Sequence, residues 1–152
     1  MERKISKVIL YSKVIIGYLS LFTISFLAAT ILPLSSELML ATMLSVESYN
    51  RTLLILFSSL GNILGSVFNW VIGFYFIKLQ DKKWFPFKEK QISKSSLWFE
   101  KYGKWSLLFA WVPVIGDPLT FVAGTMKTKF LTFIILISVG KIARYLIISL
   151  LI

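Results

Sequence analysis

Four ionisable side chains lie inside apolar stretches of this chain, where a charge is energetically unfavourable and usually serves a function. Glu37 and Asp117 each follow a proline by four residues, and Lys141 and Arg144 lie three residues apart in the last apolar run. At that spacing the two bases share one helix face. Acids in a membrane can carry protons and bases can hold anions, so these residues indicate transport chemistry. Snorkelling of the two bases to an interface is the simpler alternative.

Other reactive groups are scarce. The chain has no cysteine and no histidine, which excludes disulfides, histidine-ligated haem, the usual zinc sites and a histidine proton relay. Proton or metal chemistry therefore falls to seven acids, and none of them are spaced as a metal cluster. We expect no metal and no cofactor. We also expect no enzyme, because no serine, acid and histidine set exists and no nucleophile sits in a basic cradle.

Composition predicts an all-α integral membrane protein. Of 152 residues 57% are hydrophobic, and the mean hydropathy is +0.78. Barrel strands need only about 9–11 residues each, so the apolar runs are too long and too weakly alternating for a barrel. The net charge of +10 comes from lysines beside apolar segments, which fits a topology signal and predicts no nucleic-acid partner. The apolar runs are residues 14–32, 53–77, 106–115 and 130–152.

Two of these runs are interrupted in a way that predicts re-entrant helical hairpins. Pro113 and Pro118 each remove an N–H, Pro118 disfavours helix at Asp117, and Gly116 lets the chain turn. Broken backbone at membrane depth is tolerated only where it is buried in protein or lines a cavity. The first turn is predicted at Pro33, Ser35 and Ser36, with the serines capping the half-helix that follows.

Charge along the chain predicts the topology. We interpret the N-terminal segment as retained and not as a cleaved signal peptide. The basic residues before the first apolar run predict that the N-terminus lies in the cytoplasm. We expect one crossing to about Phe26, a short half-helix, the break, and a second half-helix returning to the outer side near residues 47–51. The lysine-rich segment 78–104 is predicted to be cytoplasmic, with an interfacial amphipathic helix capped by Ser95 or Ser96. Its aromatic residues suit the interface, and its lysines serve either topology or contact with anionic lipid.

The run 53–77 carries a face of small and amide residues. Gly61, Gly65 and Asn69 follow one another at four-residue spacing, with Asn62 on the adjacent strip. Such a face permits close helix approach and interhelical hydrogen bonds. We interpret the glycines as packing residues. For Asn62 and Asn69, packing and a ligand role both stay open.

The two halves of the chain resemble each other. Aligning Pro33 with Pro113 puts Glu37 opposite Asp117, and puts Gly61 and Asn62 within one residue of Gly140 and Lys141. We interpret the single domain 1–152 as repeat 1 (27–78), a cytoplasmic loop with the interfacial helix (79–104) and repeat 2 (105–152), the repeats being inverted. Such interrupted apolar pairs indicate a midplane binding site. Chance similarity in apolar sequence is the alternative.

The stretches FLAATILPLSSELML, LGNILGSVFNWVIGFY, FEKYGKWSLLFAWVPVIGDPLTFVAGTMK and GKIARYL resemble the DedA (VTT, SNARE-associated Golgi protein) superfamily, particularly its YqaA-type branch. The resemblance implies a bacterial inner-membrane protein with two facing re-entrant hairpins. It also implies work in membrane homeostasis, lipid scrambling or undecaprenyl phosphate recycling, coupled to an ion gradient. Where typical members carry an acid and two arginines, this chain has Ala28, Ala110 and Gly116. Lys141 and Arg144 would supply the missing positive charge.

The function predicted from these residues is a transporter or scramblase for membrane lipid, in particular an anionic lipid or polyprenyl phosphate. Half-helix N-termini with Lys141 and Arg144 would hold the head group, while Glu37 or Asp117 takes up the coupling proton or Na⁺. Two alternatives remain open. One is a transporter of small ions or solutes through the same cavity, and the other is a scaffold locked by ion pairs. The sequence does not indicate an oligomeric state.

Overall fold

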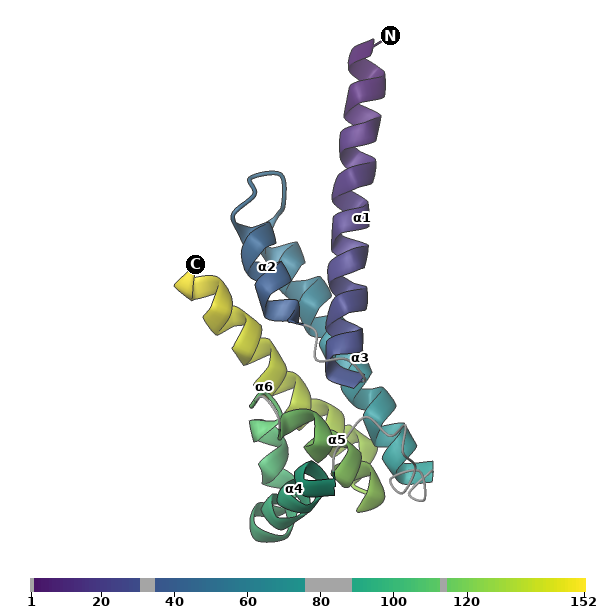
Figure 1. Ribbon diagram of the computed structural model, residues 1–152, viewed down its shortest axis with the longest axis vertical. Coiled ribbons are helices and arrows are strands. Elements are labelled where there is room, and N and C mark those ends of the chain that lie inside the picture. The colour runs from purple at the N-terminus through teal and green to yellow at the C-terminus, as the bar shows by residue number, and fades with distance from the viewer. Residues whose placement is uncertain (1, 31–34, 76–88, 113–114) are drawn as a thin grey trace.

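The computed structural model describes residues 2–30, 35–75, 89–112 and 115–152, and the side chains among them except those of residues 2–8 and 89. These ranges are helical and contain no strand. Figure 1 shows the helices in chain order. They are α1 (Glu2–Thr30), α2 (Ser36–Leu44), α3 (Arg51–Tyr75), α4 (Glu89–Tyr102), the 3-10 helix η2 (Gly103–Phe109), α5 (Gly116–Thr125) and α6 (Phe130–Leu151).

Three helices are long and apolar enough to cross a membrane, namely Ile9–Thr30 within α1, Arg51–Tyr75 and Phe130–Leu151. The prediction of an all-α integral membrane protein is thereby confirmed. Helix α2 has 9 residues and α5 has 10. At about 1.5 Å per residue each is roughly 15 Å long, only half of an apolar core of about 30 Å. These two short helices therefore cannot span it.

Helix α1 lies parallel to α3 along its C-terminal half. The backbone N–H of Asn50, just before α3, donates to the Tyr18 hydroxyl at 2.7 Å. Further along, Gly61 lies so close to the Phe22 carbonyl that a Cβ would overlap it, and Gly65 lies against Phe26 in the same way. The glycines thus serve close helix packing, as predicted.

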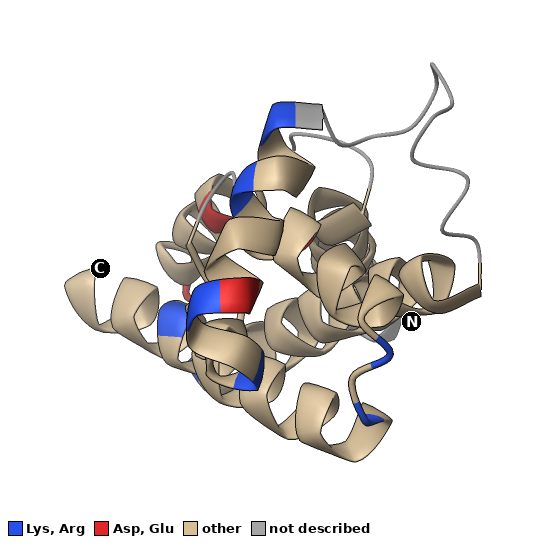
Figure 2. Ribbon diagram, turned by 90° about the horizontal axis from the view of Figure 1, so that it is seen from below, with Lys and Arg blue, Asp and Glu red and all other residues tan. Residues whose placement is uncertain are grey.

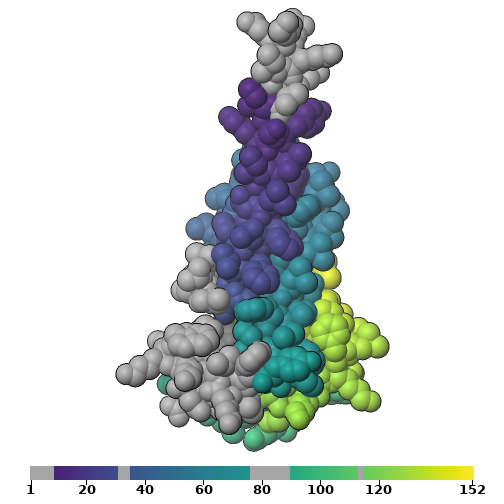
Figure 3. Space-filling model, turned by 90° about the vertical axis from the view of Figure 1, so that its right-hand side faces the viewer, coloured from purple at the N-terminus to yellow at the C-terminus, as the bar shows by residue number. Residues whose placement is uncertain are grey.

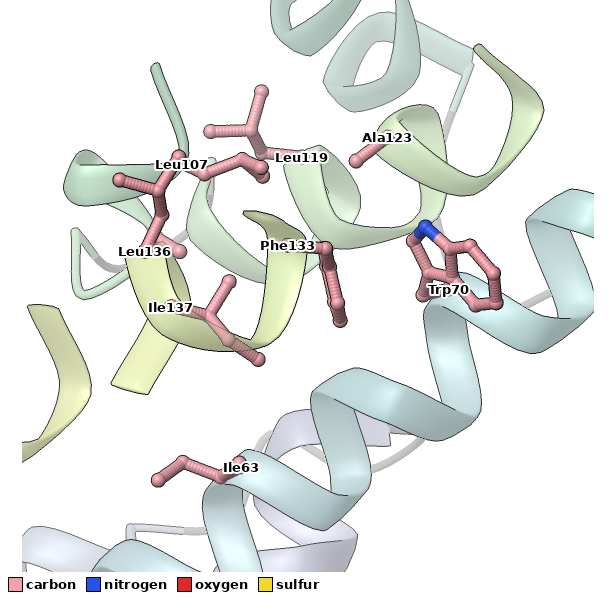
Figure 4. Close-up of a cluster of buried hydrophobic side chains, with 9 residues drawn as sticks. Ile63, Trp70, Leu107, Leu119, Ala123, Phe133, Leu136 and Ile137 are labelled. Carbon is pink, nitrogen blue, oxygen red and sulfur yellow. The ribbon is translucent and has the colours of Figure 1, made fainter. Parts of the chain in front are cut away.

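Helices α5 and α6 pack on the second half of α3, around Trp70 and Gly73. Gly73 meets the Phe121 carbonyl and Gly124 meets the Trp70 carbonyl, so α3 and α5 approach each other through a reciprocal pair of glycines. Helix α6 runs antiparallel to α3, with Phe133 packed on Trp70 at a ring distance of 5.7 Å. Figure 4 shows Trp70 and Phe133 in the buried apolar cluster that α3, α5, α6 and η2 form.

The first hairpin differs from the prediction, because α1 continues unbroken from Glu2 to Thr30. We expected a separate half-helix to begin near Phe26. No proline or glycine lies between Phe26 and Thr30, and the packing of α1 on α3 continues to Ala29, which faces Gly65. Residues 26–30 therefore continue α1 and do not start a separate half-helix.

The N-terminal end of α1 and helix α4 lie at opposite ends of the molecule (Figure 1). Since α1 and α3 are parallel, the α2–α3 connection lies beside Tyr18, and the part of α1 before Tyr18 that is coloured purple in Figure 3 extends past the other helices. The prediction put the N-terminus and segment 78–104 on one side and residues 47–51 on the other. In the structure, the start of α1 lies at the same end of the molecule as residues 47–51, and α4 lies at the other end. The side of the membrane on which the N-terminus lies stays a prediction.

Helix α4 begins at Glu89, so the predicted caps Ser95 and Ser96 lie inside it. Ser95 is buried and donates a hydrogen bond to the Ile115 carbonyl at 3.2 Å, which ties α4 to the N-cap residue of α5. Exposed lysines gather at this end of the molecule, which Figure 2 views directly. They are Lys90, Lys94, Lys101, Lys104, Lys127 and Lys129.

Candidate functional site

Helix α6 brings its two bases to the two acids that the sequence singled out. Lys141 Nζ lies 2.9 Å from Asp117 Oδ1 and also donates to Asn62 Oδ1. Arg144 contacts Glu37 Oε1 through Nε and Nη2. We call Lys141–Asp117 the inner pair and Arg144–Glu37 the outer pair. Each pair joins residues that lie far apart in sequence.

Both pairs lie near the middle of the spanning helices. Lys141 is central in α6 (Phe130–Leu151), and its partner Asn62 is central in α3 (Arg51–Tyr75). At about 1.5 Å per residue, Lys141 is roughly 16 Å from either end of α6, half the depth of an apolar core. Its side chain is 1% exposed and turned toward Asp117. Lys141 therefore does not snorkel along α6 to an interface.

The acids occupy the first turns of the two short helices, Glu37 in α2 and Asp117 in α5. The free N–H groups and the dipole of a helix N-terminus favour a carboxylate there. Ser35 caps α2 by accepting a hydrogen bond from the Leu38 N–H at 3.1 Å, as predicted. Ser36 does not cap, since its hydroxyl pairs with that of Tyr145 at 2.9 Å. Both short helices thus start beside α6, at the level of its bases.

The two pairs differ in exposure. In the inner pair, the Lys141 side chain is 1% exposed and that of Asp117 is 31% exposed. In the outer pair, the values are 19% for Arg144 and 40% for Glu37. The inner base is sealed within the protein, whereas the outer pair can be reached from outside the helix bundle.

The two asparagines have different roles. Asn62 accepts from Lys141, and its Nδ2 donates to the Ser25 carbonyl of α1 at 3.2 Å. Asn69 Nδ2 donates to the Ala29 carbonyl at 2.7 Å and to Thr120 Oγ1 at 3.2 Å. Asn62 therefore belongs to the charged site, while Asn69 joins α1 to α5 away from it.

The second hairpin turn also differs from the prediction. Asp117 and Gly116 were expected in an unwound turn, yet α5 already begins at Gly116. Pro118 lies in the first helical turn, where its missing N–H has no helical partner to lose. Gly116 is required because a Cβ there would overlap the Ala110 carbonyl. The predicted turn residues Pro33 and Pro113 lie outside the described residues.

Tyr145 is a site residue that sequence reasoning missed. It is 1% exposed and ties α6 to Ser36, next to the outer pair. Its signal was its position directly after Arg144 and four residues after Lys141, which puts it on the face of Lys141. Among the residues that the structure describes, no group of three or more acids could hold a metal ion.

Comparison with known proteins identifies the family of this chain. The VTT domain matches residues 6–152, and this chain belongs to that family, the DedA family. Inner membrane protein YqaA of Escherichia coli (strain K12) is 36% identical over 126 residues, 83% of this chain and 84% of the relative. Uncharacterized membrane protein YbfM of Bacillus subtilis is 30% identical over 134 residues, 82% of this chain and 81% of the relative.

A more distant relative carries a functional name. Undecaprenyl phosphate transporter A of Staphylococcus aureus is 25% identical over 139 residues, 82% of this chain and 66% of the relative. No solved structure matches the chain. The family and the three apolar helices make the chain a multi-pass protein of the bacterial inner membrane, as the sequence predicted.

Proposed function

We propose that this protein transports or scrambles a lipid or lipid phosphate and so serves membrane homeostasis. The proposal is carried by one observation: two acid–base pairs lie at the middle of the spanning helices, between α6 and the N-termini of two short helices. Ionisable groups at such depth are unfavourable unless paired and usually mark a substrate or ion pathway. The role proposed is transport rather than enzymatic catalysis.

The proposal includes two re-entrant hairpins that enter from opposite sides. The end of α1 with α2 would form the first, and η2 with α5 the second. In support, α2 runs from the outer pair toward the α2–α3 connection, while α5 runs from the inner pair toward the lysine-rich end. We assign that lysine-rich end to the cytoplasm by the positive-inside rule.

An inverted repeat, 27–78 and 105–152, is part of the proposal. Gly61 packs against the Phe22 carbonyl in α1, and Gly140, 79 residues later, packs against the Leu108 carbonyl in η2. Asn62 and Lys141, which are separated by the same interval, contact each other. Residues related by a two-fold axis meet where the axis passes between them. The contact therefore supports an axis through the charged site, where transporters of this kind bind substrate.

The charges support an anionic head group with a coupling cation. Two bases face two acids, so the site is balanced as it stands. Neutralising one acid with a proton, or screening it with Na⁺, leaves one base free for a phosphate. The name of the Staphylococcus aureus relative fits a polyprenyl phosphate as the substrate.

A membrane scaffold is the second candidate, because both acids already have a partner. Buried pairs of this kind can hold helices in register without moving any ligand. The two candidates differ in what the charges are needed for, which is lipid movement in one case and assembly in the other.

Reconstitution into proteoliposomes tests the proposal. Wild-type protein should move fluorescent anionic lipid between leaflets, and Glu37→Gln and Asp117→Asn, made separately, should change its rate or its dependence on an ion gradient. Glu47→Gln is the matched control, since Glu47 is an exposed acid in the α2–α3 connection. Unchanged transport in both site variants would refute the proposal. Loss of folded protein with no transport by wild type would favour the scaffold.

A further inference from the structure

We infer that Arg144 alone takes the anionic group of the lipid, and that Glu37 is the resident carboxylate which this group displaces. Lys141 positions helices instead. The inference rests on the proposed function. Lys141 and Arg144 share a helix face, so sequence spacing alone gives them the same role, and the inference assigns them different ones. It follows from the different exposure and bonding of the inner and outer pairs.

The base of the inner pair is buried and hydrogen-bonded within the protein. Lys141 Nζ donates to Asp117 of α5 and to Asn62 of α3. Asn62 in turn donates to the Ser25 carbonyl of α1. The hydrogen bonds of one buried ammonium thus connect three helices, and Asn62 extends the network to α1. A ligand at Lys141 would have to break this network, and a buried charge that loses its partner is strongly destabilising.

The outer pair differs from the inner pair in its exposure. Arg144 and Glu37 are both partly exposed. The contacts from Nε and Nη2 converge on a single oxygen, Glu37 Oε1. A guanidinium has five N–H donors in a planar fork that matches a carboxylate or a phosphate. The Glu37 carboxylate therefore occupies the position of a substrate anion and shares its chemistry.

Glu37 can leave Arg144 without α2 leaving α6. The adjacent residue Ser36 is buried and hydrogen-bonded to the buried Tyr145. One turn further on, Leu40 packs into a cluster with Tyr145 and Leu54. These contacts keep the first turn of α2 in place. The exchange of Glu37 for a phosphate then requires only rotation of one exposed side chain.

The ligand class that follows is a phosphate-bearing anionic lipid. A zwitterionic head group carries its own cation, which would compete with Arg144 for the phosphate. Arginine, in contrast to lysine, offers two parallel donors, so Arg144→Lys should already weaken binding. Free inorganic phosphate shares the recognised group but lacks the acyl chains that would reach this depth from the bilayer.

Binding of phosphatidic acid to the full-length protein in phosphatidylcholine nanodiscs, followed by native mass spectrometry, tests the inference. Glu37→Gln removes the competing charge and should tighten binding about tenfold, the equivalent of one charged hydrogen bond of roughly 1.4 kcal/mol. The double variant Glu37→Gln/Arg144→Gln leaves no unpaired charge at the outer pair, so it should fold yet lose binding. Lys141→Gln, which keeps polar contact with Asn62, should lower thermal stability and leave binding within about twofold of wild type.

Three results would overturn the inference: weaker binding by Glu37→Gln, retained binding by the double variant, or lost binding by folded Lys141→Gln. Inorganic phosphate is the competitor that separates the two sources of the anion. Millimolar phosphate should not displace the lipid, and displacement would mean that the site takes free phosphate instead.

Lipid transport is measured separately from lipid binding. A wild type that binds but moves no lipid refutes the proposed function alone, whereas lipid movement at the wild-type rate by the double variant refutes this inference alone.

Discussion

Lys141 of α6 donates a hydrogen bond to Asn62 of α3, so these two long helices contact each other near their midpoints. The same asparagine donates to the Ser25 carbonyl of α1. Asn62 therefore connects α1 to the charged site. Its two hydrogen bonds are the basis of the first prediction.

Replacing Asn62 with Leu should destabilise the fold by about 1–3 kcal/mol, because it leaves the buried Lys141 ammonium with one acceptor fewer. Thermal unfolding in detergent measures the loss. Asn62→Gln is the control, since it keeps both an amide oxygen to accept from Lys141 and an N–H to donate to the Ser25 carbonyl, and it should cost less. Equal stability of Asn62→Leu and wild type would show that the contact contributes nothing.

The inner pair should matter more for stability than the outer pair. Asp117→Asn strands a buried ammonium and should cost about 3–5 kcal/mol, the range for breaking a buried pair. Glu37→Gln affects a partly exposed pair and should cost about 1 kcal/mol or less. Adding Lys141→Met to Asp117→Asn should restore part of the loss. The prediction fails if the two single variants unfold at the same temperature.

The glycine contact between α3 and α5 should not tolerate a side chain. Gly124→Ala places a Cβ against the Trp70 carbonyl, which is backbone and cannot move aside. Overpacking of this kind costs typically about 1–3 kcal/mol. Leu60→Ala, at an exposed position of α3, is the comparison variant and should unfold close to wild type. The same ranking should appear in the yield of folded protein after extraction.

Topology can be read directly, because the chain has no native cysteine. Ser48→Cys lies in the α2–α3 connection and Ser93→Cys in α4, and both positions are exposed. We expect a membrane-impermeant maleimide added to whole cells to label Ser48→Cys only, and an N-terminal epitope tag to share the side of Ser48. Labelling of both cysteines from one side would contradict α3 as a single span.

Much of the architecture was predictable because it depends on composition and on local backbone chemistry. Mean hydropathy identified the membrane class, and the glycines at 61 and 65 identified the packing face of α3. Helix ends were less predictable. Asp117 is helical although it precedes a proline, and Ser95 bonds to Ile115 instead of capping.

The identity of the four charged residues was evident from sequence alone, since a charge in an apolar run stands out without any structure. Which acid meets which base was decided only by the tertiary structure. Lys141 and Arg144 share a helix face, yet one turns to α5 and the other to α2. Their pairing depends on how the glycine contacts set the register of α3 against α1 and α5, and of α6 against η2. Those contacts join residues distant in sequence, so no local pattern encodes them. The same holds for the end of the molecule at which α1 begins, which followed from its parallel packing on α3.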